Sequence, residues 1–118
     1  MANYIDGFTL PIQRSHINEY QTLAEKVANI WKEHGAIDYK EYVGDDLSFQ
    51  GLRSFTDLVE ANEDDFVVFG WVTFESREAR DLANAKVAAD PRMEELVAKS
   101  NSGFDAAKMV YGGFKSLV

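Results

Sequence analysis

The chain of 118 residues has no cysteine and few basic residues. Without cysteine there is no disulfide, no thiolate metal ligand and no thiol nucleophile. Twelve Lys and Arg stand against twenty Asp and Glu, which gives a formal net charge of −8. Binding to phosphate backbones or anionic membrane surfaces needs clustered cations. We therefore expect neither nucleic acid nor a membrane as a partner.

Signatures of metal and cofactor sites are also absent. There is no GxGxxG, Walker or GxSxG motif, and His16 and His34 are not part of a metal-ligand pattern. We therefore expect no metal and no cofactor. No apolar run approaches the ~18 residues of a membrane span, and the first residues do not resemble a signal peptide. These absences predict a cytoplasmic protein, and the length predicts one domain over residues 1–118.

The most informative stretch is the β-branched and aromatic run over residues 65–74. Successive side chains of a strand point to opposite faces, and here both sets are apolar. We therefore expect both faces of this strand to be covered. We assign Phe66, Val68, Gly70, Val72 and Phe74 to the side of the helices. The other set, Val67, Phe69, Trp71 and Thr73, is assigned to a second subunit or to a cavity between subunits.

The flanking segments predict the other elements. Residues 3–12 alternate as a strand that ends at Pro11. A helix over residues 15–34 has Ser15 as N-cap, Gly35 after its last turn, and an inner stripe of Tyr20, Leu23, Ala24, Val27, Trp31 and His34. Residues 36–43 form a strand. Gly44-Asp45-Asp46 breaks this strand. Residues 47–64 give no clear pattern, although 52–59 fits a short strand or a helical turn.

Two helices and a strand complete the prediction. Ser76 caps a helix whose inner stripe is Ala79, Leu82, Ala83, Lys86 and Ala89; we expect Lys86 to bury its alkyl stem and keep its ammonium at the rim. A short helix follows over residues 91–99, and a strand over 109–118. The order predicts an α+β, ferredoxin-like βαββαβ fold: an antiparallel four-stranded sheet with two helices on one face.

Two helices cannot cover both faces of such a sheet. We place the small residues Gly7, Thr9 and Gly70 beneath the helices. We then place Phe8, Phe69, Trp71, Met109 and Tyr111 on the open face, where they exceed the apolar patch of a typical monomer. A two-fold homodimer that packs sheet against sheet, as a dimeric α/β barrel, would bury them.

Several segments resemble the YbaA-like family of small bacterial proteins. They include YIDGF at 4–8, WKEHGA at 31–36, VVFGW at 67–71, DPRM at 90–93 and MVYGGF at 109–114. The resemblance covers nearly the whole chain in the same motif order. It implies a ferredoxin-like fold of the dimeric α/β-barrel superfamily. It implies no activity, because the function of that family is unknown.

Two residues are candidates for acid–base catalysis. Asp6 shares the face of Phe8, so its carboxylate should be buried, and it needs a partner or a raised pKa. Tyr111, Tyr39, Arg77 and Lys86 are the candidate partners. His34 at the helix end is either a general base at a pocket mouth or a cation that stabilises the helix dipole. For both residues the structural role is the alternative to catalysis.

The aromatic residues predict a ligand pocket formed by Phe8, Tyr39, Phe69, Trp71 and Tyr111. In the first functional hypothesis, a homodimer binds a small organic molecule there; an enzyme of this kind would be a cofactor-free oxygenase or isomerase. In the alternative, a non-catalytic homodimer with a structural, stress-related or partner-binding role uses the same aromatics only to fill its interface. Room for a ligand beside Asp6 distinguishes the two hypotheses.

Overall fold

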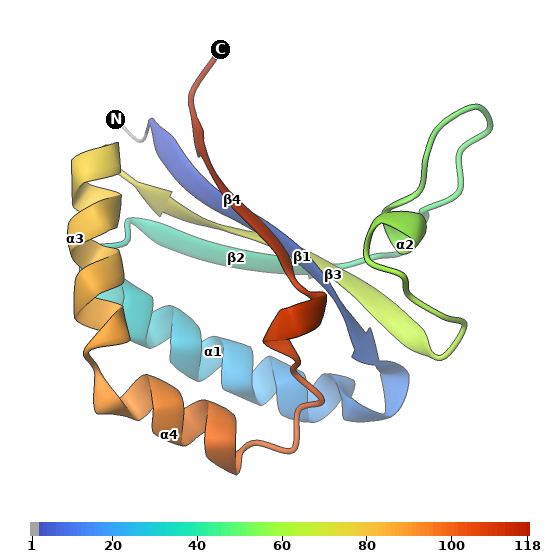
Figure 1. Ribbon diagram of the computed structural model, residues 1–118, viewed down its shortest axis with the longest axis horizontal. Helices are drawn as coiled ribbons and strands as arrows, with labels where there is room; N and C mark the ends of the chain where they lie inside the picture. The colour runs from blue at the N-terminus through green and yellow to red at the C-terminus, as the bar shows by residue number, and fades with distance from the viewer. Residues whose placement is uncertain (1–2) are drawn as a thin grey trace.

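The computed structural model describes residues 3–118 and contains one four-stranded antiparallel sheet in the order β2-β3-β1-β4 (Figure 1). The strands are β1 (Tyr4–Gln13), β2 (Asp38–Val43), β3 (Asp65–Phe74) and β4 (Val110–Lys115). The helices are α1 (Ile17–Glu33), α2 (Phe55–Leu58), α3 (Arg77–Ala88) and α4 (Pro91–Lys99). Short 3-10 turns lie at Arg14–His16 and Ala106–Lys108. The predicted ferredoxin-like α+β fold is confirmed.

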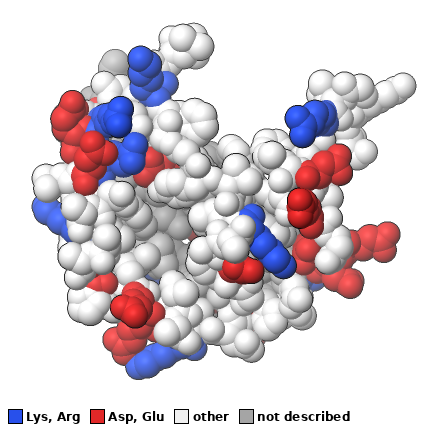
Figure 2. Space-filling model, viewed as in Figure 1, with Lys and Arg blue, Asp and Glu red and all other residues white. Residues whose placement is uncertain are grey.

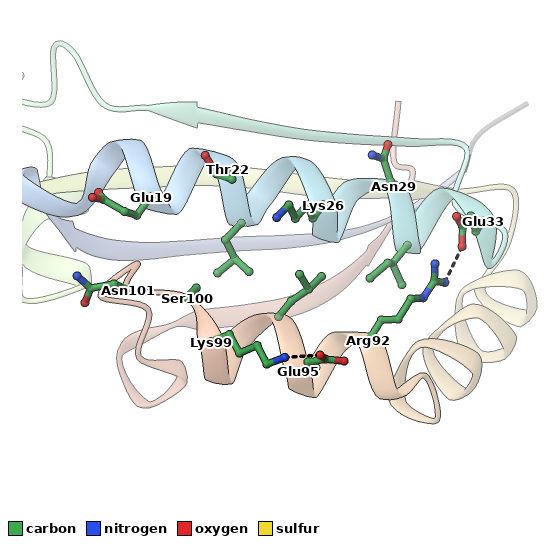
Figure 3. A pocket seen from close by; sticks show the side chains of 13 residues that line it. Glu19, Thr22, Lys26, Asn29, Glu33, Arg92, Glu95, Lys99, Ser100 and Asn101 are labelled. Carbon is green, nitrogen blue, oxygen red and sulfur yellow. Dashed lines mark hydrogen bonds and ion pairs between the residues drawn. The ribbon is translucent and has the colours of Figure 1, made fainter.

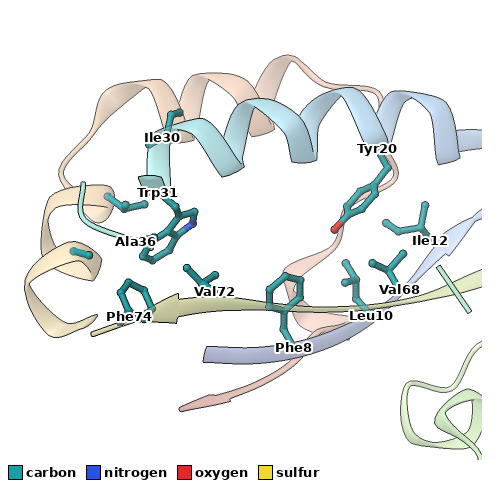
Figure 4. Packing of buried hydrophobic residues seen from close by; sticks show 12 residues of the cluster. Phe8, Leu10, Ile12, Tyr20, Ile30, Trp31, Ala36, Val68, Val72 and Phe74 are labelled. Atoms are coloured by element: carbon teal, nitrogen blue, oxygen red, sulfur yellow. The ribbon is translucent and has the colours of Figure 1, made fainter. Parts of the chain in front are cut away.

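Helices α1, α3 and α4 share one face of the sheet, and the core lies beneath them (Figure 4). The sheet contributes alternate residues of β1 and β3, among them Leu10, Val72 and Phe74, which are almost completely buried. The ring of Trp31 on α1 meets Phe74 edge-on, with 6.0 Å between the ring centroids. The predicted helix-facing set of β3 is therefore confirmed.

The pairing of β1 with β3 corrects the predicted face of the first strand. Residues directly opposite each other in an antiparallel pair share a face, and Phe8 lies opposite Gly70. Phe8 therefore lies under the helices, and so does Tyr111, which lies opposite Phe8 on β4. Met109 also packs against the helix-covered core. Gly7 and Thr9 lie on the other face, opposite Trp71 and Phe69.

Pro11 does not end β1, in contrast to the prediction. The strand continues to Gln13, and Pro11 lies opposite Val67. The pairing of β1 with β4 stops at Thr9. The backbone of β1 is therefore unpaired on the β4 side at Pro11, where the missing N–H of proline costs no ladder hydrogen bond.

The helix ends agree with the predictions except at the start of α1. Ser76 and Asp90 accept hydrogen bonds from the backbone N–H groups of Ala79 and Arg92, at 3.0 and 2.9 Å, and so cap α3 and α4. Gly35 follows α1 with a φ of 117°, which favours glycine. Ser15 is not the N-cap of α1, because a 3-10 turn over Arg14–His16 precedes the helix.

The inner stripe of α3 also differs from the prediction. Ala83 and Val87 are buried against the core, whereas Leu82 and Lys86 are exposed. The helix is therefore rotated relative to the predicted stripe, and Lys86 needs no buried path for its stem. The rotation places Arg80 over the sheet, a position that the sequence pattern did not assign to it.

The second face of the sheet is only partly covered. The segment between β2 and β3 contains α2, which crosses one end of this face, and Phe55 meets Phe69 at 5.5 Å between ring centroids. Trp71 does not contact a helix of the helix-covered face; it stacks on Tyr42, with centroids 5.5 Å apart. Exposed apolar residues of this face include Phe69, Tyr42, Val110 and Phe114. No helix within residues 3–118 has the length and apolar character to cross a membrane.

Gly70 offers a test of the packing. A Cβ atom added there would lie 2.5 Å from the carbonyl oxygen of Lys40 and 2.7 Å from Cζ of Phe8. We predict that Gly70→Ala lowers the free energy of unfolding by about 1–3 kcal/mol through this overpacking. Urea denaturation measures the loss. Gly112→Ala is the matched control, because its Cβ would make only an ordinary 3.6 Å contact with Phe114. Equal effects of the two substitutions would contradict the packing described.

Candidate functional site

A cavity of about 140 Å³ lies between the sheet and the helices α1 and α4. Its lining is aromatic or aliphatic apart from one carboxyl group, that of Glu41. The sheet supplies Phe8, Tyr39, Glu41, Val72 and Tyr111, and the helices supply Tyr20, Leu23, Ala24, Val27, Trp31, Met93 and Val97. Figure 2 shows a hollow with largely uncharged borders near the middle of this side of the molecule, and the charged side chains lie mostly around its periphery.

The floor of the cavity depends on Gly70. Phe8 and Glu41 lie opposite Gly70 on the two neighbouring strands, so all three share the helix-covered face. Because Gly70 has no side chain, the ring of Phe8 and the Cγ of Glu41 occupy the space above it. The Phe8 ring also stacks on Tyr111, with centroids 6.0 Å apart and an interplanar angle of 12°. A glycine in a central strand thus makes room for a flat aromatic floor.

Glu41 receives hydrogen bonds from two tyrosines. The Tyr39 hydroxyl donates to Oε2 at 2.7 Å, and the Tyr20 hydroxyl donates to Oε1. Figure 4 shows Tyr20 extending from α1 toward the sheet with its hydroxyl directed into the space near Phe8. Burial raises the pKa of Glu41, and the two donors counteract this only in part. Burial and the neighbouring Glu41 carboxyl raise the pKa of both tyrosines, so they remain protonated donors.

Asp6 forms a second buried carboxyl site beside the cavity. Its side chain is 1% exposed, and its Oδ2 accepts a hydrogen bond from the Tyr111 hydroxyl at 2.8 Å. Its Oδ1 lies 3.5 Å from Nε of Arg80 on α3. Burial raises the pKa of Asp6, while Tyr111 and Arg80 lower it. Tyr111 was among the partners predicted for Asp6, whereas Arg80 was not.

His34 lies away from the cavity. Its Nε2 is 2.8 Å from Oδ2 of Asp90, the residue that caps α4. Arg92 also binds Asp90, and together Arg92 and His34 hold the pKa of the Asp90 carboxyl below its ordinary value. This contact joins the end of α1 to the start of α4. The geometry favours the structural role of His34 over that of a general base.

The five residues predicted to form one pocket occupy two different faces of the sheet. Phe8, Tyr39 and Tyr111 line the cavity beneath the helices. Phe69 and Trp71 lie on the opposite face of the sheet. Trp71 lies opposite Gly7, and Phe8 lies opposite Gly70. Only the register of β1 against β3 therefore reveals that Phe8 and Trp71 are on different faces.

Glu41 and Tyr20 are site residues that the sequence analysis did not select. Tyr20 was assigned to the core stripe of its helix, and Glu41 lies in a strand that reads as polar. One signal was present in β2, because Tyr39, Glu41 and Val43 alternate with Asp38, Lys40 and Tyr42. The set that contains Glu41 faces the core. Because each set contains a tyrosine, the sequence does not show which set is buried.

A larger groove of about 750 Å³ runs between α1 and α4 on the surface (Figure 3). Four of its six charged lining residues pair with one another: Arg92 with Glu33 and Lys99 with Glu95, each at 2.6 Å. These side chains are about half exposed or more. Exposed ion pairs of this kind contribute little energy. The smaller cavity holds a largely buried carboxyl group and is the stronger candidate. Across residues 3–118, no group of three or more His, Asp or Glu side chains is arranged to hold a metal ion.

The hydrogen bonds to Glu41 lead to a prediction for stability. Tyr39→Phe removes a donor from a largely buried carboxyl group, so we expect the free energy of unfolding to fall by about 1–3 kcal/mol. We also expect the pKa of Glu41 to rise further, because a donor that stabilises its ionised form is gone; carbon-13 NMR of the carboxyl group measures this. Tyr42→Phe, at a residue that is 59% exposed, is the control. An unchanged pKa in Tyr39→Phe would contradict the assigned contact.

Comparisons with known proteins identify the family. The model of DUF1428, described as a protein of unknown function, matches residues 3–106. The uncharacterized protein YbaA of Escherichia coli K12 is 36% identical over 115 residues, which cover 98% of this chain and 97% of YbaA. YbaA of Shigella flexneri matches to the same extent.

Solved structures show the same fold at low identity. A NIPSNAP family protein of unknown function from Agrobacterium tumefaciens matches with a TM-score of 0.59 and 17% identity, over 97% of this chain and 87% of that one. SnoaB from Streptomyces nogalater, described as a cofactor-independent oxygenase, matches with a TM-score of 0.51 and 12% identity, over 99% and 96% of the two chains. At these identities the likeness shows the fold alone. The chain belongs to the DUF1428 family and is a relative of YbaA, which confirms the family predicted from its sequence motifs.

Proposed function

We propose that this protein binds a small organic molecule in the cavity between the sheet and helices α1 and α4. The observation that carries the proposal is the Glu41 carboxyl group, which faces an otherwise uncharged cavity. Among residues 3–118 it has two tyrosine donors and no ion pair with a basic side chain. Burying a carboxylate without a counter-ion is costly. An apolar residue at this position would serve the core better, so a role toward a ligand explains Glu41.

Proton transfer is the chemistry that this site supports. Burial raises the pKa of Glu41, which brings the group closer to the range in which it can take up and return a proton near neutral pH. A cofactor-free oxygenase or isomerase would need such a base. The likeness to SnoaB concerns only the fold, so the case for an enzyme rests on Glu41 and its two tyrosines.

We propose further that the protein is a homodimer whose subunits pack through the second face of the sheet. Phe69, Tyr42 and Phe114 are 43%, 59% and 58% exposed on this face. Aromatic side chains of this size gain most from complete burial, and a two-fold axis lets one patch cover its own copy. This arrangement keeps the predicted dimer, but the residues in its interface change: Phe69 and Trp71 belong to it, whereas Phe8 and Tyr111 do not.

The alternative function is a non-catalytic homodimer with a structural, stress-related or partner-binding role. The exposed aromatic face supports the dimer in either case. Occupancy of the cavity beneath the helices separates the two functions, because a purely structural protein has no use for a ligand there. Native mass spectrometry of the purified protein reports the mass of the assembly and any retained molecule together.

Binding in the cavity can be tested with fluorobenzene. An apolar cavity of about 150 Å³ is large enough to hold benzene, so we expect fluorobenzene to bind and to shift the NMR signals of Tyr39 and Tyr111. Ala24→Leu extends a side chain into the cavity and should abolish binding while the fold is kept. Ala28→Leu, one turn further along α1 and outside the cavity lining, should bind normally. Binding that survives in Ala24→Leu would place the ligand elsewhere.

The dimer can be tested by light scattering coupled to size exclusion at micromolar concentration. We expect the wild-type protein to have the mass of two chains. Tyr42→Asp and Trp71→Asp each place a charge in the proposed interface and should give monomers with unchanged circular dichroism. Leu82→Asp is the control, since Leu82 is 59% exposed on α3, on the other side of the molecule. A monomeric wild-type protein would overturn the assembly.

A further inference from the structure

The oxygen atoms that face the cavity are available to a ligand as acceptors. Tyr20 and Tyr39 give their hydroxyl hydrogens to Glu41, and Tyr111 gives its hydrogen to Asp6. A tyrosine hydroxyl has one hydrogen to donate, so all three are committed. An ionised carboxylate has about four lone-pair positions, of which the two tyrosines use two. The oxygen groups left for a ligand are lone pairs on Glu41 and on the tyrosines. The lining also includes Trp31, whose indole N–H is an uncharged donor.

The charges around the cavity disfavour an anionic ligand. Glu41 is the one charged residue in the lining, and no lysine or arginine within residues 3–118 contributes to it. Arg80 lies beside Asp6 and is directed to Asp6 and to the Tyr4 hydroxyl. A buried anion beside Glu41 would lack a counter-ion and would meet a like charge.

The shape of the cavity favours one flat ring. Phe8 and Tyr111 form a stacked pair on the sheet side, and the volume is about 140 Å³. An apolar cavity of about 150 Å³ accommodates benzene. A single six-membered ring with a small substituent therefore fits, whereas a fused multi-ring compound does not fit unless the helices move.

We propose that the ligand is a single-ring aromatic or similarly flat molecule that carries an uncharged O–H donor directed at Glu41, and that anions of the same size are rejected. The inference rests on the proposed binding function of this cavity and adds the chemical class of the ligand. It follows from the juxtaposition of an apolar cavity without basic side chains, a stacked aromatic floor and an ion-pair-free carboxylate.

Three probes with the same six-membered ring separate the effects of ring size, O–H donor and negative charge. They are phenol, fluorobenzene and benzoate, titrated at pH 7 and followed by NMR. Phenol is an uncharged donor at this pH, fluorobenzene has no donor and benzoate is an anion. Because a hydrogen bond to a charged group is worth roughly a tenfold change in affinity or more, we expect phenol to bind about tenfold more tightly than fluorobenzene. We expect no binding of benzoate at millimolar concentration.

Glu41→Gln tests the residue that sets this preference. The amide is close in shape but brings an N–H₂ donor and no charge, so the affinity ratio of phenol to fluorobenzene should fall toward one. Glu94→Gln, at an exposed residue of α4 that does not line the cavity, is the matched control and should keep the ratio. The comparison of probes on the wild-type protein needs no variant, so a poorly folded Glu41→Gln does not remove the test.

The outcomes distinguish the two proposals. Failure of both phenol and fluorobenzene to bind would overturn the proposed function of the cavity. Binding of fluorobenzene as tight as that of phenol, or binding of benzoate, would leave the cavity as a binding site and overturn the ligand class. An unchanged phenol preference in a folded Glu41→Gln protein would show that Glu41 is not the acceptor.

Discussion

The antiparallel register of β1 against β3 is the constraint on which the rest of the structure depends. It places Phe8 opposite Gly70 and Asp6 opposite Val72, so both residues of β1 lie under the helices. Gly70 has no side chain, and the Phe8 ring uses the space above it. A slip of one residue would move every side chain of β1 to the other face. It would expose Leu10 and Ile12, which are 0% and 1% exposed. Because exposing these apolar side chains to water costs free energy, their burial fixes the register.

Two carboxyl groups, one fully buried and one largely buried, are the features that packing alone does not explain. Asp6 is held by Tyr111 and lies near Arg80, and Glu41 is held by two tyrosines. Burial raises the pKa of both groups. The two environments differ in charge, because Asp6 has a cation nearby and Glu41 has none in its ion-pair range. The Asp6 site therefore resembles a structural contact that orients Tyr111. The Glu41 site resembles one that is available to a ligand.

The sequence was a good guide to the elements and a weaker guide to the site. Alternation and caps predicted the four strands and helices α1, α3 and α4, because these signals are local. Asp6 was also predicted to be buried and to need a partner, and Tyr111 was one of four candidates for that partner. Arg80 was missed because the stripe of α3 was predicted with a different rotation. Glu41 was missed because Tyr39 and Tyr42 lie on opposite sides of a strand with no clear apolar face.

Periodicity within one element is set by the backbone, so the sequence by itself determined which side chains of β3 lie together and that both sides of this strand are apolar. It also determined the family, through motifs spread along the chain. Which side of β1 joins which side of β3 depends on hydrogen bonds between residues about sixty positions apart in the sequence. Only the tertiary structure decided this. It moved Phe8 and Tyr111 into the cavity with Glu41, and it left Phe69 and Trp71 on the face proposed for a second subunit.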